Sequence, residues 1–236
     1  MKRSLTWLIS TVLFVSAACS RQAEPPPPPE EIVSRAVDTM TDVKAFNFSI
    51  DRSGGPAFLD PGETISFRRA EGVYVAPDRA RATVRVIVPG LIAEVSMVAI
   101  GDQYWETNVL TREWVELPAG QSFNPADLFD VERGLQPILD SSLTDLVYDG
   151  LVELEEIPGL QLHQVSGLLD ASALYDLSFG LIGPDTTEVQ LWIHPESYET
   201  YRIVITEPIA AGLEESSVWR VDFWRFGEVE EISPPA

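Results

Sequence analysis

The chain has 236 residues, of which 45% are hydrophobic, and 37 acidic residues against 16 basic ones give a net charge of −21. A chain of this length suits one large domain, because all-β folds of more than about 200 residues are routinely single domains. The anionic surface repels phosphate backbones and anionic lipid headgroups, and no run of Lys and Arg offsets it, which argues against nucleic-acid binding and against electrostatic adhesion to membranes.

The N-terminus has the pattern of a secretory signal. Lys2 and Arg3 precede an apolar run from Leu5 to Val15, and Ala17-Ala18 stand directly before Cys19. This order predicts a signal peptide over residues 1–18 that is cut before Cys19, whose thiol then carries lipid. Cys19 is the only cysteine of the chain, so it cannot form an intramolecular disulfide.

An alternative is ordinary signal cleavage near Ala18, which leaves Cys19 as a free thiol. Ser16 favours this alternative, since a lipoprotein signal usually carries Leu or another aliphatic residue there. The apolar run is shorter than the ~20 residues that a spanning helix needs. Cleavage removes Lys2 and Arg3 and leaves a net charge of −23, so anchoring depends on the diacylglycerol and palmitate chains that a lipoprotein carries.

A proline-rich segment follows the cysteine. Pro25 to Pro29 are five consecutive prolines, flanked by Glu24, Glu30 and Glu31. Such a run forms an extended, semi-rigid polyproline helix. We interpret residues 19–31 as a stalk and residues 32–236 as one domain. We favour a stalk over recognition of the prolines by an aromatic groove of another protein, because proteins with such grooves are mostly intracellular and this segment should lie outside the cell.

The first regular element after the stalk is predicted to be a helix over Glu30 to Val43, where apolar residues recur at three- and four-residue steps. After it the period changes to two, as in Arg79 to Val88 and Leu91 to Ala99, which Pro89-Gly90 joins into a hairpin. The other predicted strands are Phe46 to Ile50, Thr64 to Val75, Gln103 to Thr107, Trp114 to Leu117, Leu146 to Glu155, Leu160 to Gly167, Glu188 to His194, Tyr201 to Thr206 and Ser217 to Phe226.

These roughly ten strands are joined mostly by short turns, which favours an antiparallel meander over a parallel sheet. Short helical inserts are predicted at Asn124 to Asp130, with Asn124 as the cap and Pro125 at the first helical position, at Gly134 to Leu143 and at Asp170 to Phe179. So few helices cannot cover a long flat sheet. We therefore predict a mainly β (α+β) fold in which the sheet either curls on itself as a barrel or half-barrel or wraps an apolar cavity. Periodicity alone slightly favours an ordinary packed core instead.

The sequence contains no recognisable catalytic or metal-binding pattern. G-x-S-x-G, H-E-x-x-H and glycine-rich phosphate loops are absent, and His163 and His194 have no neighbouring Cys or His. Acidic groups such as Glu153, Glu155, Glu156 and Glu228, Glu230, Glu231 occur by chance in so acidic a chain, and Asn47-Phe48-Ser49 is a weak glycosylation signal. We expect no catalytic residue, metal or cofactor.

Several segments, in order along the chain, resemble the mycobacterial LppX/LprA/LprF/LprG family of lipoproteins. The most specific is Gly101-Asp102 with Trp105, Thr107-Asn108, Thr111 and Trp114, a G-D…W-x-T-N-x-x-T-x-x-W pattern that no general β-sheet constraint demands. Trp224 and Gly227 stand where we expect Ser and Asp. The other matching segments are Asp42 to Phe48, Glu71-Gly72 with Pro77-Asp78-Arg79, Phe123-Asn124-Pro125 with Leu128-Phe129-Asp130 and Gly134-Leu135, Leu191-Trp192-Ile193, and Val221-Asp222-Phe223.

The resemblance implies a curved antiparallel sheet closed by helices over a large apolar cavity, similar also to the LolA/LolB carriers, in which acylated lipids bind. It makes the apolar stripes a cavity wall and transfers no catalytic residue. The expected lining residues are Phe46, Phe48, Val84, Val86, Val95, Met97, Leu191, Ile193, Ile203, Val221 and Phe223.

We interpret the chain as a non-enzymatic, membrane-anchored extracytoplasmic lipoprotein that binds acylated lipid or glycolipid and carries or presents it in the cell envelope. Its expected partners are the lipid ligand, the membrane and a lipid exporter or acceptor protein. One alternative is an envelope scaffold or partner-binding β-domain without a lipid cavity. Another is an envelope hydrolase that uses two carboxylates with strongly split pKa values in one cleft.

Overall fold

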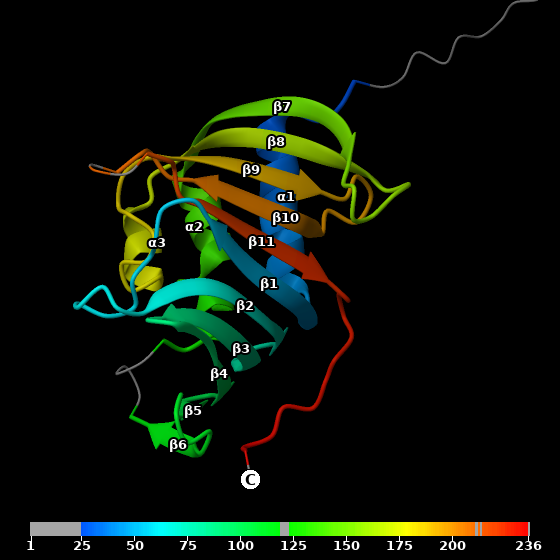
Figure 1. Cartoon of the computed structure of the whole chain (residues 1–236). Coiled ribbons are helices and arrows are strands. Elements are labelled where there is room, and N and C mark those ends of the chain that lie inside the picture. The colour runs from blue at the N-terminus through cyan, green and yellow to red at the C-terminus, as the bar shows by residue number, and fades with distance from the viewer. Residues whose placement is uncertain (1–24, 119–122, 211, 213, 236) are drawn as a thin grey trace, which may run out of the picture.

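In the computed structural model, residues 25–118, 123–210, 212 and 214–235 are described, and these residues fold around one antiparallel sheet of eleven strands (Figure 1). The strands are β1 (Ala45–Ser53), β2 (Ser66–Val75), β3 (Arg79–Val88), β4 (Leu91–Ile100), β5 (Gln103–Thr107), β6 (Trp114–Leu117), β7 (Leu143–Glu153), β8 (Gln161–Leu169), β9 (Thr187–Ile193), β10 (Thr200–Thr206) and β11 (Val218–Trp224). The helices are α1 (Pro29–Asp42), the 3₁₀ turn η1 (Asp127–Phe129), α2 (Leu135–Ser142) and α3 (Ser172–Leu177). None of the helices in the described residues is long and apolar enough to cross a membrane.

The sheet has the strand order β6-β5-β4-β3-β2-β1-β11-β10-β9-β8-β7. The chain runs outward from β1 to the edge strand β6, crosses through η1 and α2 to the opposite edge at β7, and returns to β11, which pairs with β1. The edge strands β6 and β7 do not pair, so the strongly bent sheet stays open (Figure 1). The prediction of a mainly β, curved antiparallel sheet with few helices is confirmed, with eleven strands in place of roughly ten.

The alternating residues of β3 divide the sheet into two faces. Ala82, Val84 and Val86 are buried, whereas Arg81 and Arg85 on the opposite side are exposed. The hairpin register continues this face into β4, since Val84 lies opposite Val95 and Ala82 opposite Met97. We call the face with Val84 the inner face and the face with Arg81 the outer face.

Most predicted strands differ from the observed strands by one to three residues at one or both ends, and the differences in β7 and β11 have a local cause. β7 begins at Leu143, three residues earlier than predicted, because its pairing with β8 shifts register between Thr144 and Val147 and the apolar pattern is broken there. Asp145 has a φ of 52° at this irregularity. β11 ends at Trp224, before the predicted Phe226, because Arg225 turns the backbone with a φ of 56°.

Helix α1 confirms the first predicted helix to within one residue at each end. Ile32, Val33, Ala36 and Met40 are its buried residues. It begins at Pro29, so the last three residues that we assigned to the stalk, 29–31, are helical. The predicted signal peptide and lipid attachment site Cys19 lie outside the described residues.

The predicted helix over Asn124 to Asp130 is wrong: only the single turn η1 forms there. Asn124 accepts a hydrogen bond at its Oδ1 from the Ala126 amide at 2.9 Å and thus initiates a turn. Because such side-chain bonds compete with helical ones, the segment stays short. Helix α2 lies within the predicted Gly134 to Leu143. Helix α3 is shorter than the predicted Asp170 to Phe179, since Asp170 accepts a hydrogen bond from the Ser172 amide just before the helix begins.

The main hydrophobic core lies between the inner face and the helices. It joins Ile32 and Met40 of α1 to Leu135 and Leu139 of α2 and to inner-face residues such as Phe223. A second, small cluster lies on the outer face, where the C-terminal segment returns along the sheet and places Ile232 against Val73, Val98 and Trp105 (Figure 1). The C-terminal segment therefore covers part of the outer face, and the helices cover part of the inner face.

Candidate ligand cavity

An apolar cavity of about 510 Å³ lies between the inner face of the sheet and the helical inserts. One wall consists of inner-face residues of the central strands, and the other consists of residues from η1, α2 and the segment around α3. The sheet wall includes Ala70, Val84, Val86, Val95, Met97 and Val221. The facing wall includes Leu128, Leu135, Leu174, Leu177, Leu181 and Ile182.

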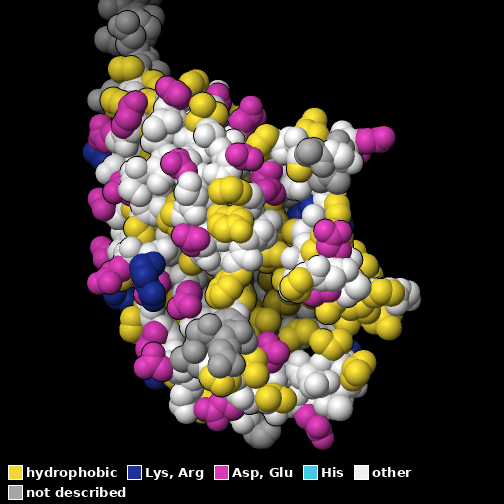
Figure 2. Space-filling view, turned by 90° about the vertical axis from the view of Figure 1, so that its left-hand side faces the viewer, with side chains coloured by type: hydrophobic (Ala, Val, Ile, Leu, Met, Phe, Trp, Pro, Cys, Tyr) yellow, Lys and Arg dark blue, Asp and Glu magenta, His cyan; other side chains and the backbone are white. Residues whose placement is uncertain are grey.

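The cavity opens to solvent where the β1–β2 loop faces the segment after α3. Phe58, Leu59 and Phe179 line it and yet remain 38%, 45% and 62% exposed. Figure 2 views the molecule from the left-hand side of Figure 1 and shows hydrophobic side chains gathered in a hollow. Large apolar side chains at an opening leave a hydrophobic path from the surface into the interior.

The predicted lining residues divide into two groups. Val84, Val86, Val95, Met97 and Val221 border the cavity. The other six do not border it, although all are buried in the same core cluster: Phe46, Phe48, Leu191, Ile193, Ile203 and Phe223.

Helix α1 and helix α2 fill the inner face where this second group lies. Leu191, Ile203 and Phe223 border only a gap of about 10 Å³ against residues such as Met40 and Leu139. Such a gap holds at most about one water molecule and no acyl chain. This half of the inner face is therefore packed core rather than cavity wall.

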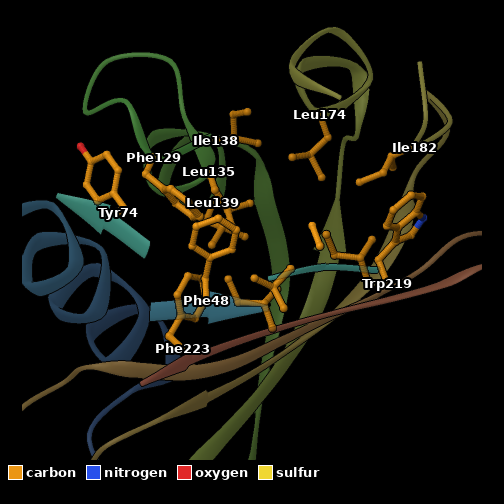
Figure 3. Packing of buried hydrophobic residues seen from close by; sticks show 14 of the residues in the cluster. Phe48, Tyr74, Phe129, Leu135, Ile138, Leu139, Leu174, Ile182, Trp219 and Phe223 are labelled. Atoms are coloured by element: carbon orange, nitrogen blue, oxygen red, sulfur yellow. The ribbon is translucent and has the colours of Figure 1, made fainter. Parts of the chain in front are cut away.

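Phe129 of η1 separates the packed half from the cavity. Its ring contacts those of Phe46, Phe48, Tyr74 and Phe223, with centroid distances of 4.9, 4.8, 5.2 and 6.1 Å. Figure 3 shows four of these aromatic side chains gathered near α2, away from Leu174, Ile182 and Trp219 on the cavity side; the four are Phe48, Tyr74, Phe129 and Phe223. Tilted and edge-to-face pairs of this kind stabilise beyond their buried area.

Local hydrogen bonds fix the segment that carries Phe129. Asp130 accepts bonds at its Oδ1 from the amides of Glu132 and Arg133, both at 2.9 Å. A Cβ on Gly134 would lie 2.6 Å from the Asp130 carbonyl oxygen, so only glycine fits this close approach. In the matching segment Phe123 to Leu135, turn geometry thus explains Asn124, Asp130 and Gly134, and aromatic packing explains Phe129.

The sequence reasoning missed the wall opposite the sheet. Leu174, Leu177, Leu181 and Ile182 were not assigned to the cavity, nor were Phe58 and Leu59. The only available signal was the apolar spacing of the α3 segment, which indicates a buried face but not its partner.

The cavity contains little polarity. Its described polar lining residues are Glu106 and Ser178. The Ser178 hydroxyl already accepts a bond from the Ile182 amide at 3.0 Å. Glu106 accepts a bond at its Oε2 from the hydroxyl of buried Tyr104 at 3.2 Å. Burial, and then the charge of Glu106, raises the pKa of Tyr104, so this phenol remains a donor.

A second hollow of about 520 Å³ lies on the outer face, and it is polar. Arg81 there pairs with Glu230 at 2.9 Å, and Arg85 pairs with Glu94 at 2.8 Å. Asn47, Thr83 and Trp114 also line it. An acyl chain in this hollow would desolvate charged groups, which makes the inner cavity the better candidate for an apolar ligand.

Both histidines make structural hydrogen bonds. His163 Nδ1 lies 3.0 Å from the Tyr148 hydroxyl, and burial, followed by the charge of His194, lowers the pKa of His163. His194 accepts a bond at its Nδ1 from the Ser197 amide at 3.1 Å. Within the described ranges, no three His, Cys, Asp or Glu side chains gather in a way that could hold a metal ion.

The fold and the cavity define a mainly β protein with an internal apolar cavity. A model of the LppX_LprAFG lipoprotein family matches residues 28–228. The chain belongs to this family, whose members are envelope-associated, membrane-anchored lipoproteins.

Solved structures show the same fold at low sequence identity. LprF from Mycobacterium bovis has a TM-score of 0.67 and 15% identity over 90% of this chain and 99% of that chain. LppX from Mycobacterium tuberculosis has a TM-score of 0.60 and 16% identity over 89% of this chain and 100% of that chain. No curated protein sequence matches significantly.

Proposed function

We propose that this chain is a lipoprotein, anchored through Cys19, whose inner cavity binds the acyl chains of lipids and carries or presents them in the cell envelope. The observation that carries this proposal is the apolar cavity of about 510 Å³ between Val84 and Val95 on one side and Leu174 and Ile182 on the other. Its volume lies within the ~300–1,000 Å³ of small-molecule sites. Each buried CH₂ group contributes about 0.8 kcal/mol.

The opening supports carriage or presentation of a lipid rather than permanent burial. Phe58, Leu59 and Phe179 connect the cavity to the surface, so an acyl chain can enter without crossing a polar barrier. An acylated lipid or a glycolipid is the ligand that we propose, and a lipid exporter or acceptor is the protein partner. The anchor would place the domain on the extracytoplasmic side of the membrane.

The two alternatives fit the cavity less well. A scaffold domain without a lipid cavity has no need for this open apolar space. A hydrolase that uses a carboxylate pair needs two acids in one cleft, whereas Glu106 is the one acid among the described lining residues.

The test is extraction of non-covalently bound lipid from the full chain purified from its own host, followed by mass spectrometry. We expect near-stoichiometric acylated lipid with the wild type and much less with Val84→Trp, whose indole would occupy the cavity. Thr83→Trp is the matched control, because Thr83 lies next in the strand and lines the outer hollow. Wild-type protein without bound lipid would refute the proposal and favour the scaffold alternative.

A further inference from the structure

One charged side chain, that of Glu106, is among the described residues that line the mostly apolar cavity. Glu106 of β5 lies opposite Met97 of β4, so both side chains project from the inner face. The neighbouring inner-face residue of β5 is Tyr104, which is buried and whose hydroxyl donates to Glu106 Oε2 at 3.2 Å.

One of the two oxygens of this carboxylate has no hydrogen-bond donor among the described residues. Glu106 Oε1 accepts no hydrogen bond from any residue in the described part of the chain, and Glu106 forms no ion pair there within 4.0 Å. A carboxylate that faces an apolar space without a countercharge disfavours a second negative charge beside it and accepts hydrogen bonds readily.

We propose that Glu106, with Tyr104 beside it, makes the cavity selective for acyl ligands with an uncharged, hydroxyl-bearing head over ligands that end in an ionised acid. This inference rests on the proposed function, because it presumes that acyl chains occupy the cavity. A ligand hydroxyl donates to the free Oε1 in a charge-assisted bond. A carboxylate or phosphate in the same place would be repelled by the charge of Glu106, and the apolar lining of the cavity screens this repulsion less than bulk water does.

An ammonium head is the other group that a carboxylate attracts. Its burial removes the hydration of both charges, and in a low-dielectric site this loss offsets much of the attraction between them. A hydroxyl costs less to desolvate and also can accept a hydrogen bond. The single carboxylate beside a phenol hydroxyl therefore fits an uncharged polyol head better than a cation.

The test compares ligands with the same acyl chain in the full-length protein. Binding of 1-monolauroylglycerol, laurate and dodecylamine is measured calorimetrically below their micelle concentrations, at about pH 8, where laurate is ionised. We expect the wild type to bind 1-monolauroylglycerol at least about tenfold more tightly than either charged ligand, as one charge-assisted hydrogen bond allows.

Substitution of Glu106 separates charge from shape. Glu106→Gln is nearly isosteric, and we expect it to raise laurate affinity about tenfold, which removes most of the selectivity. Glu106→Asp keeps the charge, so the affinity for laurate should remain as low as in the wild type. Glu94→Gln is the matched control, since Glu94 lies on the outer face of the adjacent strand. This substitution should not change the affinity for any of the three ligands.

The outcomes separate this inference from the proposed function. If Glu106→Gln discriminates between the ligands as the wild type does, or if dodecylamine binds the wild type most tightly, the selectivity proposal is wrong while acyl binding stands. If folded wild-type protein binds none of the three ligands, both the selectivity proposal and the proposed binding of acyl chains in the cavity are wrong. Melting temperatures of all variants verify that each is folded.

Discussion

Tyr74 illustrates how a single polar atom is accommodated in the aromatic core. The residue is 3% exposed, its ring lies 5.2 Å from those of Phe46 and Phe129, and its hydroxyl donates to the Pro77 carbonyl oxygen at 2.8 Å. Burial, and then the charges of Asp130 and Asp78, raises the pKa of Tyr74 to about 12. The phenol must therefore stay protonated for this packing to persist.

This shift predicts a specific loss of stability in alkali. Because the folded pKa is above the unfolded value of about 10, the contribution of Tyr74 is fully present below about pH 10 and is lost as pH rises towards about 12. Tyr74→Phe should cost about 1 kcal/mol at neutral pH through the lost hydrogen bond. It should also remove up to about 2–3 kcal/mol of the alkaline decline in the free energy of unfolding.

Urea unfolding of wild type and variant at about pH 8 and about pH 11.5 measures both effects. Tyr175→Phe is the control, because Tyr175 is 44% exposed and outside the core cluster. Identical pH dependence in the wild type and Tyr74→Phe would show that ionisation of Tyr74 is not coupled to unfolding.

At the scale of elements, strand β4 contributes residues both to the cavity wall and to the packed core of the inner face. Val95 and Ala99 of β4 project to the same side, but Val95 borders the cavity whereas Ala99 is fully buried in the core cluster. The same substitution at these two positions therefore distinguishes a residue that borders open space from a residue in a tightly packed core.

We expect Val95→Trp to leave the melting temperature nearly unchanged and to reduce bound lipid, because the indole can enter the cavity. Ala99→Trp has no such space and should destabilise the fold by about 1–3 kcal/mol or more through overpacking. Thermal unfolding and lipid recovered per mole of protein are measured together. Equal destabilisation by the two substitutions would mean that the space beside Val95 is not available in solution.

At the scale of the whole molecule, the sheet unites segments from both ends of the chain. β1 pairs with β11, with Phe48 opposite Phe223, and the C-terminal segment then crosses the outer face to Ile232. The centre of the sheet therefore joins strands that lie far apart in the sequence.

The anchor leads to a prediction about location. We expect Cys19→Ala to release the protein from the membrane fraction, because a net charge of −21 gives the chain no electrostatic attraction to anionic headgroups. Fractionation of cells and mass determination of the mature N-terminus measure this. Cys19→Ala protein that stays in the membrane fraction, or wild type that begins at another residue, would exclude Cys19 as the anchor.

The sequence by itself determined the class of fold and the direction of most side chains. The two-residue period of Arg79 to Val88 and the Pro89-Gly90 turn specify a hairpin and its two faces, because side chains alternate along a strand. The periodicity of the first helix identified its buried residues in the same way. These features depend on neighbours in the sequence, so local patterns contain them.

Only the tertiary structure decided which part of the inner face borders a cavity. Phe48 and Val84 have the same alternation and burial, but Phe129, far along the chain, packs on Phe48, whereas Val84 borders the open space of the cavity. The sequence also did not indicate which of its 37 acidic residues lines the cavity, and the tertiary structure places Glu106 there. Periodicity reports which side of an element is apolar, whereas a cavity depends on what packs against that side, and long-range packing supplies this.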